Sequence, residues 1–278
     1  MRSGFATLLG RPNVGKSTLL NHILGTKVSI VSNKVQTTRH AVRGVLTRPE
    51  AQIVFVDTPG IHKPRTALGT RLNATAQDAL DGVDVVCLVL DATAPFGDGD
   101  RFVASLTPPD ALVVVNKVDR ASKDQVITQL AAAGQLERAE YFPISARTGK
   151  GVDVLVDAIA ARLPEGPLLY PADQITDTSD EHWAAELVRE QLLAILREEL
   201  PHSVTCRVVD WEWPMVKIEI LVERDSQKGI VIGKKGEVLK RVGIAVREQM
   251  DEGVYLDLVV KVEKDWQRRD ATLDRLGF

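Results

Sequence analysis

The sequence predicts an α/β domain with a mostly parallel sheet in three layers, followed by a smaller α+β domain. Short apolar runs typical of buried strands recur between Phe5 and Ile144, and helix-like runs follow the first of them and close the series. A stretch rich in proline and glycine, Leu163 to Asp180, has no sustained periodicity and indicates a linker. Beyond it, the pattern gives the order α-β-β-α-β. We expect a first domain over 1–165, a linker over 166–180 and a second domain over 181–278.

Composition restricts the class of protein. The 278 residues suit about two domains, and 44% apolar with 26% charged residues is ordinary for a soluble globular protein. A net charge of -3 excludes a uniformly basic coat, so any nucleic-acid binding must use a local patch. Cys87 and Cys206 lie in apolar contexts and are expected to be buried and reduced. With no long apolar run and no signal peptide before the first strand, we expect a cytoplasmic protein.

The strongest motif is Gly10 to Thr18, which fits G-x-x-x-x-G-K-[ST], a loop whose backbone N–H groups wrap nucleotide phosphates. A strand-like run, Phe5 to Leu9, precedes it, and a helix-like run to Leu24 would aim its positive N-terminus at the anion. Chance gives such a match about 0.01 times in this length, so an ordinary glycine turn is a poor alternative. The predicted phosphate-binding residues are Gly10, Arg11, Pro12, Asn13, Val14, Gly15, Lys16, Ser17, Thr18, Asp57, Thr58, Pro59 and Gly60.

Two later stretches supply partners for a magnesium ion and a γ-phosphate. Thr37 and Thr38 precede an alternating stretch, and a loop threonine there could place its hydroxyl on magnesium; the sequence leaves open which one. Asp57 to Gly60 follows the apolar run Gln52 to Val56, so the aspartate is expected at the sheet edge where the phosphate loop also lies. D-x-x-G alone is weak evidence for a nucleotide site, but its position one strand after the two threonines makes the prediction specific. The predicted magnesium ligands are Ser17, Thr38 and Asp57, with Thr37 and Thr38 in a switch loop.

The residues expected to bind the base come after two apolar runs that are typical of central parallel strands, Asp84 to Leu90 and Ala111 to Val115. Asp119 can accept two hydrogen bonds from the guanine edge, whereas adenine would leave this carboxylate unpaired. The predicted guanine contacts are Asn116, bridging loops around the base; Lys117, packing on its plane; Asp119; Ser145; and Ala146, whose N–H would meet guanine O6. In their order, these motifs resemble those of the GTPase superfamily. An ATP-using enzyme, such as a small-molecule kinase, is the alternative that Asn116 and Asp119 oppose.

The second half resembles a type II KH fold, a single-stranded RNA binder whose G-x-x-G loop clamps backbone nucleotides. Its pattern gives a helix from Trp183 to Leu200 stopped by Pro201, strands at Val204–Val209, Val216–Val222 and Val254–Val262, and a helical run to Met250 after the loop. Chance alone gives about 1.4 G-x-x-G matches here, so only the context favours RNA. The predicted RNA contacts are Lys228, Ile230, Val231, Ile232, Gly233, Lys234, Lys235, Gly236, Lys240 and Arg241. The alternative is a protein-binding or dimerising module without RNA.

Together the two halves resemble the Era family of bacterial ribosome-assembly GTPases over nearly the whole chain. The matching stretches are Gln36–His40, Asp57–His62, Ile175–Asp177, Leu200–Ser203, Lys228–Gly236 and Trp266 with Leu276–Phe278. The resemblance implies a P-loop GTPase domain with a type II KH domain, GTP/GDP and Mg²⁺ as ligands, and binding of the 3′ region of small-subunit ribosomal RNA during 30S maturation. It also implies peripheral inner-membrane association in some members. One departure is the unusually short helical segment within Phe96 to Pro109.

Hydrolysis is less well specified by the sequence. The position after D-x-x-G, where Ras-type GTPases carry a water-orienting glutamine, is Ile61, so slow intrinsic turnover is expected. Related GTPases with asparagine at the position of Asn13 use a potassium ion, and we carry that over as an expectation. Arg39 or Arg43 acting as an arginine finger is the alternative.

Overall fold

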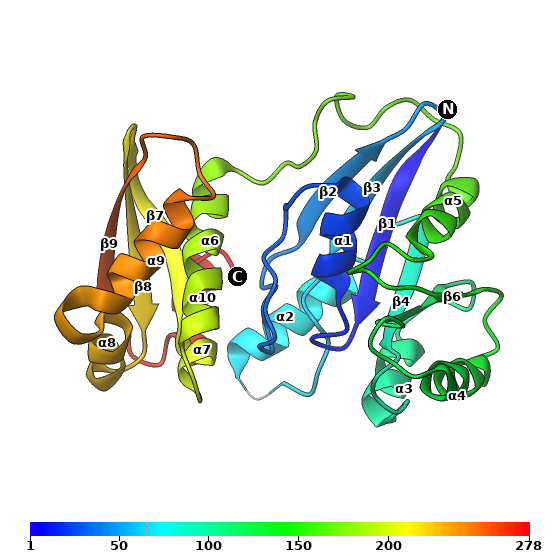
Figure 1. The fold of residues 1–278 in the computed structure, drawn as a ribbon, viewed down its shortest axis with the longest axis horizontal. Coiled ribbons are helices and arrows are strands. Elements are labelled where there is room, and N and C mark those ends of the chain that lie inside the picture. Colours follow the sequence, from blue (N-terminus) through cyan, green and yellow to red (C-terminus); the bar gives the residue numbers. More distant parts are fainter. Residues whose placement is uncertain (65) are drawn as a thin grey trace. The chain divides into compact units, whose positions relative to one another are not determined.

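The first of two sheets has six strands in the order β2-β3-β1-β4-β5-β6, all parallel except β2, which runs antiparallel to β3 (Figure 1). The strands are β1 (Arg2–Gly10), β2 (Val42–Thr47), β3 (Ala51–Asp57), β4 (Val85–Asp91), β5 (Leu112–Asn116) and β6 (Tyr141–Pro143). This computed structural model describes residues 1–64 and 66–278.

Helices cover both faces of this sheet, which explains why its central strands have continuous apolar runs. The helices are α1 (Lys16–Leu24), α2 (Ala67–Asp78), α3 (Asp98–Ser105), α4 (Lys123–Gly134) and α5 (Val152–Arg162). One face packs on α1 and α5 through residues such as Leu19 and Ile159. The other packs on α2, α3 and α4 through residues such as Ala76, Val103 and Ala133. The predicted three-layer, mostly parallel architecture is confirmed.

The second sheet has three strands, β7 (Thr205–Glu212), β8 (Met215–Val222) and β9 (Tyr255–Val262), in that order. β7 pairs antiparallel and β9 parallel with β8. The remaining helices are α6 (Asp180–Ile195), α7 (Leu200–Ser203), α8 (Asp225–Ile232), α9 (Glu237–Arg247) and α10 (Asp270–Arg275). Alternate residues of β8, such as Ile218 and Ile220, form a core with Leu187 of α6, Val231 of α8 and Val242 of α9. A mixed sheet with helices on its core face gives the α+β class that was predicted.

Contacts within the chain define two compact units, one ending at Asp177 and the other running from Thr178 to Phe278. Two short segments, Ser32–Thr37 and Thr66–Leu68, group with the second unit. The predicted linker contains neither helix nor strand before Asp180, where α6 begins, and it carries hydrogen bonds to the first unit. The exact domain limits given above remain predictions.

Three local expectations for the second half are wrong. The first helix ends at Ile195 rather than Leu200, because Leu196 is already extended. Pro201 does not stop a helix but lies in the first turn of α7, where its missing N–H costs nothing. The order α-β-β-α-β omits α8, since its β-branched end, Ile230 to Ile232, resembles a strand.

The two cysteines differ in environment. Cys87 is buried in the middle of β4, and burial raises the pKa of its thiol to about 12. Cys206 is only half-buried, against the expectation that both would be buried. No helix in the described part of the chain is long and apolar enough to cross a membrane.

Candidate nucleotide and RNA sites

The phosphate loop joins β1 to α1 and depends on glycine at both ends. A Cβ at Gly10 would lie 2.6 Å from the carbonyl oxygen of Val89. Gly15 caps α1 with φ of 100°, a conformation that side chains disfavour. The Lys16 ammonium folds back over the loop, donating to the Gly10 carbonyl at 3.3 Å. Burial lowers the pKa of Lys16, and the nearby negative charge of Asp57 partly opposes this. The phosphate loop therefore encloses the buried ammonium group of Lys16 among its backbone groups.

Asp57, the last residue of β3, gathers hydroxyl groups around a buried carboxylate. Its Oδ2 accepts hydrogen bonds from Ser17 Oγ at 2.7 Å, Ser29 Oγ at 2.9 Å and Thr38 Oγ1 at 3.4 Å. Its Oδ1 has no hydrogen-bond partner within residues 1–64 and 66–278. Burial raises the pKa of Asp57, against the charge of Lys16 and the hydroxyl hydrogen bonds.

The two switch threonines differ in their contacts with this cluster. Thr38 Oγ1 lies 3.0 Å from Ser17 Oγ. The Thr37 hydroxyl instead contacts Ser32 Oγ and donates to the Lys34 carbonyl at 2.7 Å. Ser17, Thr38 and Asp57 thus bring together hard oxygen donors with one carboxylate oxygen uncommitted, which fits Mg²⁺. The structure favours Thr38 over Thr37 as the magnesium residue.

The D-x-x-G turn lies directly against the phosphate loop. A Cβ at Gly60 would come within 2.7 Å of the Pro12 backbone, so only glycine permits this approach. The next residue, Ile61, donates its N–H to the Gly10 carbonyl at 3.2 Å, and its side chain is buried in the core. Ile61 therefore serves packing and offers no group to orient water.

Asn116, at the end of β5, ties together the loops expected around the base. Its Nδ2 donates to the Val14 carbonyl at 2.8 Å, and its Oδ1 accepts from the Ala146 N–H at 2.9 Å. The Ala146 N–H predicted for guanine O6 is thus engaged by Asn116, and contact with O6 would require a shared hydrogen bond. Lys117 Nζ bridges the Asn13 carbonyl and Asp91, which positions its stem beside the phosphate loop.

Asp119 carries the charge expected at the guanine edge. It accepts a hydrogen bond from Ser145 Oγ at 2.7 Å and pairs with Arg147 at 2.5 Å. The hydrogen bond from Ser145, followed by the interaction with Arg147, lowers the pKa of Asp119 despite partial burial. The carboxylate is therefore ionised at neutral pH and able to accept two donors.

Sequence reasoning missed several residues of this site. Ser29 and Arg147 belong to no motif and gave no signal. Asp91 ends β4 as Asp57 ends β3, so its place at the carboxyl edge of a predicted parallel strand could have identified it. Arg43, considered as an arginine finger, instead pairs with Asp177 at 3.0 Å.

The G-x-x-G loop of the second unit exposes two lysines on a turn that requires glycine. Gly233 and Gly236 have φ of 76° and 79°, and a Cβ at Gly233 would lie 2.6 Å from Val238. Lys234 and Lys235 between them are exposed, as are Lys228, Lys240 and Arg241.

One predicted RNA contact in this region is wrong. The side chain of Val231 is fully buried in the core because it faces inward from α8, so it cannot line a groove. Its neighbour Ile230 is 53% exposed.

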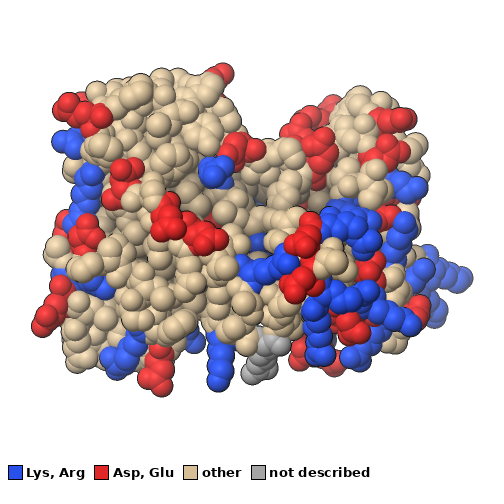
Figure 2. Space-filling model, turned by 180° about the vertical axis from the view of Figure 1, so that it is seen from behind, with Lys and Arg blue, Asp and Glu red and all other residues tan. Residues whose placement is uncertain are grey.

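Basic residues are concentrated around this loop, between Asp225 and Arg247, and we call this region the α8–α9 patch. Between Asp225 and Arg247 there are six Lys or Arg residues and two Asp or Glu residues. On the face shown in Figure 2, basic and acidic side chains are interspersed over the second unit at the right, while the first unit is mostly neutral. RNA binding would therefore depend on the α8–α9 patch and not on the charge of the domain.

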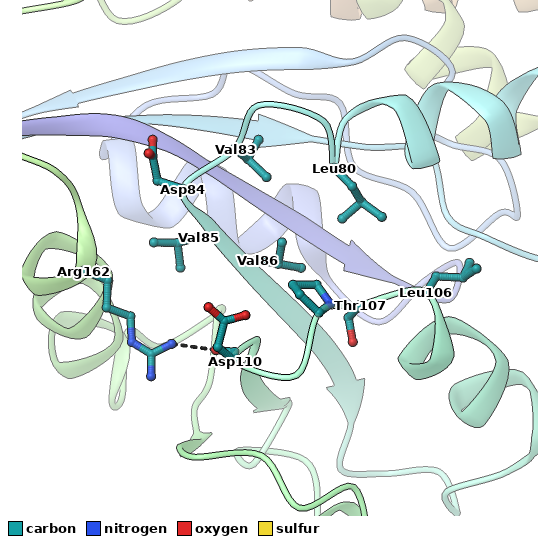
Figure 3. Close-up of a pocket in the computed structure, with 10 residues that line it drawn as sticks. Leu80, Val83, Asp84, Val85, Val86, Leu106, Thr107, Asp110 and Arg162 are labelled. Carbon is teal, nitrogen blue, oxygen red and sulfur yellow. Dashed lines mark hydrogen bonds between the residues drawn. The ribbon is translucent and has the colours of Figure 1, made fainter.

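A cavity of about 690 Å³ in the first unit is separate from the nucleotide loops (Figure 3). It lies where β4 begins, at Val85 and Val86, and is bordered by Leu106 and Pro108 after the short helix α3. Arg162 at its rim donates to the Asp110 carbonyl at 2.7 Å. Since the nucleotide residues follow the opposite ends of the strands, this cavity is not part of their site.

Comparisons with known proteins decide the family. The model of the 50S ribosome-binding GTPase family matches residues 5–117, and that of the KH domain matches residues 199–267. GTPase Era of Mycobacterium sp. (strain JLS) is 48% identical, over 100% of this chain and 99% of the relative. The chain belongs to the Era family of GTPases. GTPase Era of Mycobacterium tuberculosis (strain ATCC 25177 / H37Ra) is 47% identical over 99% and 98% of the two chains.

Solved structures agree with this assignment. A single-residue variant of Aquifex aeolicus Era bound to GDP.AlF4- is 39% identical with a TM-score of 0.95, covering 100% of this chain and 99% of the other. A structure of Era with MgGDPNP and nucleotides 1506–1542 of 16S ribosomal RNA matches with the same identity, coverage and score. The predicted family and fold are confirmed, and the chain is an enzyme that hydrolyses GTP.

The geometry at Asp119 predicts a change of base preference. Asp119→Asn should weaken GTP binding about 100-fold, since one hydrogen bond to the carboxylate is replaced by an N–H group that faces the guanine amine and the other loses its charged acceptor. It should favour xanthosine triphosphate, whose ring offers a carbonyl in place of the amine. Competition between the two nucleotides for the labelled protein measures this, with Asp124→Asn on the first turn of α4 as control. Unchanged GTP preference in Asp119→Asn would show that Asp119 does not face the base.

Proposed function

We propose that this GTPase is a switch protein that binds the 3′ region of small-subunit ribosomal RNA through its KH domain during 30S maturation. The observation that carries this is the exposed Lys234–Lys235 pair, held between two glycines of positive φ within the basic α8–α9 patch. Backbone approach at the glycines and charge at the lysines suit the clamping of consecutive phosphates. The RNA held by the solved Era relative supports the choice of RNA.

The nucleotide site is proposed to use the residues predicted from the motifs. Lys16 would hold the outer phosphates, with the N–H groups of the phosphate loop and of Gly60. Ser17, Thr38 and Asp57 would hold Mg²⁺, which when bound neutralises charge on the phosphates. Asn116, Lys117, Asp119 and the Ser145–Ala146 loop would enclose the guanine. Since Ile61 provides no polar group, slow intrinsic turnover follows.

The switch is proposed to act through the threonine loop. With GTP and Mg²⁺ bound, Thr38 would be held on the Asp57 cluster, and the segment around it would become ordered. If that order favours RNA binding, linkage requires RNA to favour GTP over GDP by the same amount, about 1–3 kcal/mol. Two domains that bind their ligands independently are the alternative.

RNA binding through the loop predicts a specific salt dependence. Replacing both Lys234 and Lys235 by Ala should lower affinity for an RNA of the 16S 3′ region about tenfold or more. Two lost phosphate contacts on a single strand should also reduce the slope of log affinity against log salt by about 1.4. Fluorescence titration at several salt concentrations measures both, with Lys264→Ala as a matched surface control. Affinity and slope that stay unchanged would favour a protein-binding module instead.

Potassium is proposed as an additional ion beside Asn13. The support is local: Asn13 has φ of 64°, its carbonyl accepts from Lys117 Nζ at 2.6 Å, and the residue is exposed at the loop. GTP turnover is expected to be faster in potassium than in sodium at equal ionic strength, and Asn13→Ala should abolish the difference. Equal rates in the two salts, with Asn13→Ala silent, would remove the ion from the mechanism.

A cytoplasmic location with peripheral contact to the inner membrane is also proposed, supported by the family resemblance alone. Flotation with anionic lipid vesicles tests the contact, and recovery of all protein in the vesicle-free fractions would contradict it.

A further inference from the structure

One face of the second sheet is open to solvent at the end where β8 and β9 both begin (Figure 1). Val216 and Leu256 point into the core, and successive side chains of a strand alternate between the two faces of a sheet. Met215 and Tyr255, which are paired across the two strands, therefore lie on the opposite face, where they are 50% and 60% exposed. Toward the other end of this face, Leu221 is only 2% exposed. The face is thus covered at one end and open at the other.

Trp213 extends this open region into the turn between β7 and β8. Its side chain is 54% exposed, and the Tyr255 N–H donates to the Pro214 carbonyl at 2.8 Å, which fixes the start of β9 against the turn. Single exposed apolar side chains are ordinary, whereas a group of large ones marks an interaction surface. Trp, Tyr and Met are also residue types that are enriched in protein interfaces. We call Trp213, Met215 and Tyr255 the hairpin patch.

Carboxylates flank the hairpin patch along the chain and across the strands. The stretches 209–217 and 251–257 contain five Asp or Glu residues and one Lys. That lysine, Lys217, lies with its Nζ 3.8 Å from Oδ2 of Asp257. The other four carboxylates are exposed and form no ion pair within residues 1–64 and 66–278; they are Asp210, Glu212, Asp251 and Glu252. The exposed aromatic rings are therefore set in a negatively charged surface.

This charge discriminates between the candidate partners of the hairpin patch. Single-stranded RNA and anionic lipid surfaces are held by Lys and Arg, so carboxylates without a cationic partner would repel both. A second copy of the chain, related by twofold symmetry, would place this acidic surface against itself. A basic polypeptide gains from both features of the surface, because Arg side chains pair with carboxylates and stack on aromatic rings.

We propose that the hairpin patch is a docking surface for an Arg-rich polypeptide segment. Guanidinium groups of that segment stack on Trp213 and Tyr255, and neighbouring carboxylates such as Glu212 accept their N–H groups. Arg is favoured over Lys because a planar guanidinium stacks and donates hydrogen bonds at the same time. The hairpin patch shares no residue with the nucleotide loops or with the α8–α9 patch. The polypeptide is therefore a partner in addition to the nucleotide and the RNA, and its docking does not depend on the proposed RNA binding.

Binding of fluorescein-labelled nona-arginine to the full chain, measured by fluorescence anisotropy at low salt, tests this docking surface. Replacing both Trp213 and Tyr255 by Ala is expected to weaken binding about fivefold or more, since two cation–π contacts are lost. Asp210→Asn combined with Glu212→Gln is expected to weaken binding by a similar factor, and this effect should shrink as salt is added.

Two controls separate docking on the hairpin patch from general attraction between opposite charges. Asp78→Asn with Asp81→Asn removes the same charge from exposed positions of the first unit and should leave binding unchanged. Nona-lysine carries the same charge as nona-arginine without planar groups. The unchanged chain should bind it about fivefold more weakly, and the variant without Trp213 and Tyr255 should bind the two peptides equally.

The contradicting outcomes are distinct. No binding of nona-arginine, or binding that is insensitive to both double substitutions in the hairpin patch, would overturn the docking surface. Equal binding of the two peptides by the unchanged chain would overturn the stacking on Trp213 and Tyr255. An RNA of the 16S 3′ region should bind the aromatic double variant as tightly as the unchanged chain. Weaker RNA binding by that variant would make the patch part of the RNA site and overturn the polypeptide partner.

Discussion

The buried carboxylate of Asp57 is the constraint on which the nucleotide-binding half depends. A carboxylate removed from water is costly unless charge and hydrogen bonds compensate, and burial raises its pKa accordingly. Three hydroxyls and the Lys16 ammonium provide part of that compensation, and they come from α1 and from the long connection that follows it. One oxygen remains unpaired in the described chain. The unpaired oxygen and the hydroxyl groups around it are therefore suited to bind a cation.

The parallel sheet makes this arrangement possible. Gly10, Asp57, Asp91 and Asn116 each end a strand, so residues far apart in sequence meet at one edge. β2, which runs antiparallel to its neighbour in that sheet, begins opposite Asp57 and forms an edge on which Thr176 makes an isolated antiparallel bridge to Gly44. The strand that follows the switch loop is therefore paired with the residue of the cation site and also forms the sheet edge that Ile175–Asp177 contacts.

The sequence predicted best where a residue type is required by local geometry. Gly10 and Gly60 are required by close backbone approach and Gly15 by its positive φ, and the spacing of the motifs follows from these requirements. The sequence was a poor predictor where tertiary contacts determine the local structure. Ile230 to Ile232 has strand-like composition, yet packing of Val231 into the core makes it a helix end. The choice between Thr37 and Thr38 depends on which hydroxyl reaches Asp57. The contact of Ile175–Asp177 with the edge of β2 could not be predicted, because so few residues show no periodic pattern and their partner is distant in the sequence.

The central claim is that the Asp57–Thr38 cluster makes RNA binding depend on the nucleotide. The most direct measurement is the affinity of the full chain for an RNA of the 16S 3′ region, with GDP and with Mg²⁺ and a non-hydrolysable GTP analogue, at one fixed salt concentration. The account predicts binding about 5–150-fold tighter with the analogue, and the same factor in the preference of the RNA-bound protein for the analogue over GDP. Equal affinities in the two states would contradict it and leave two independent binding domains.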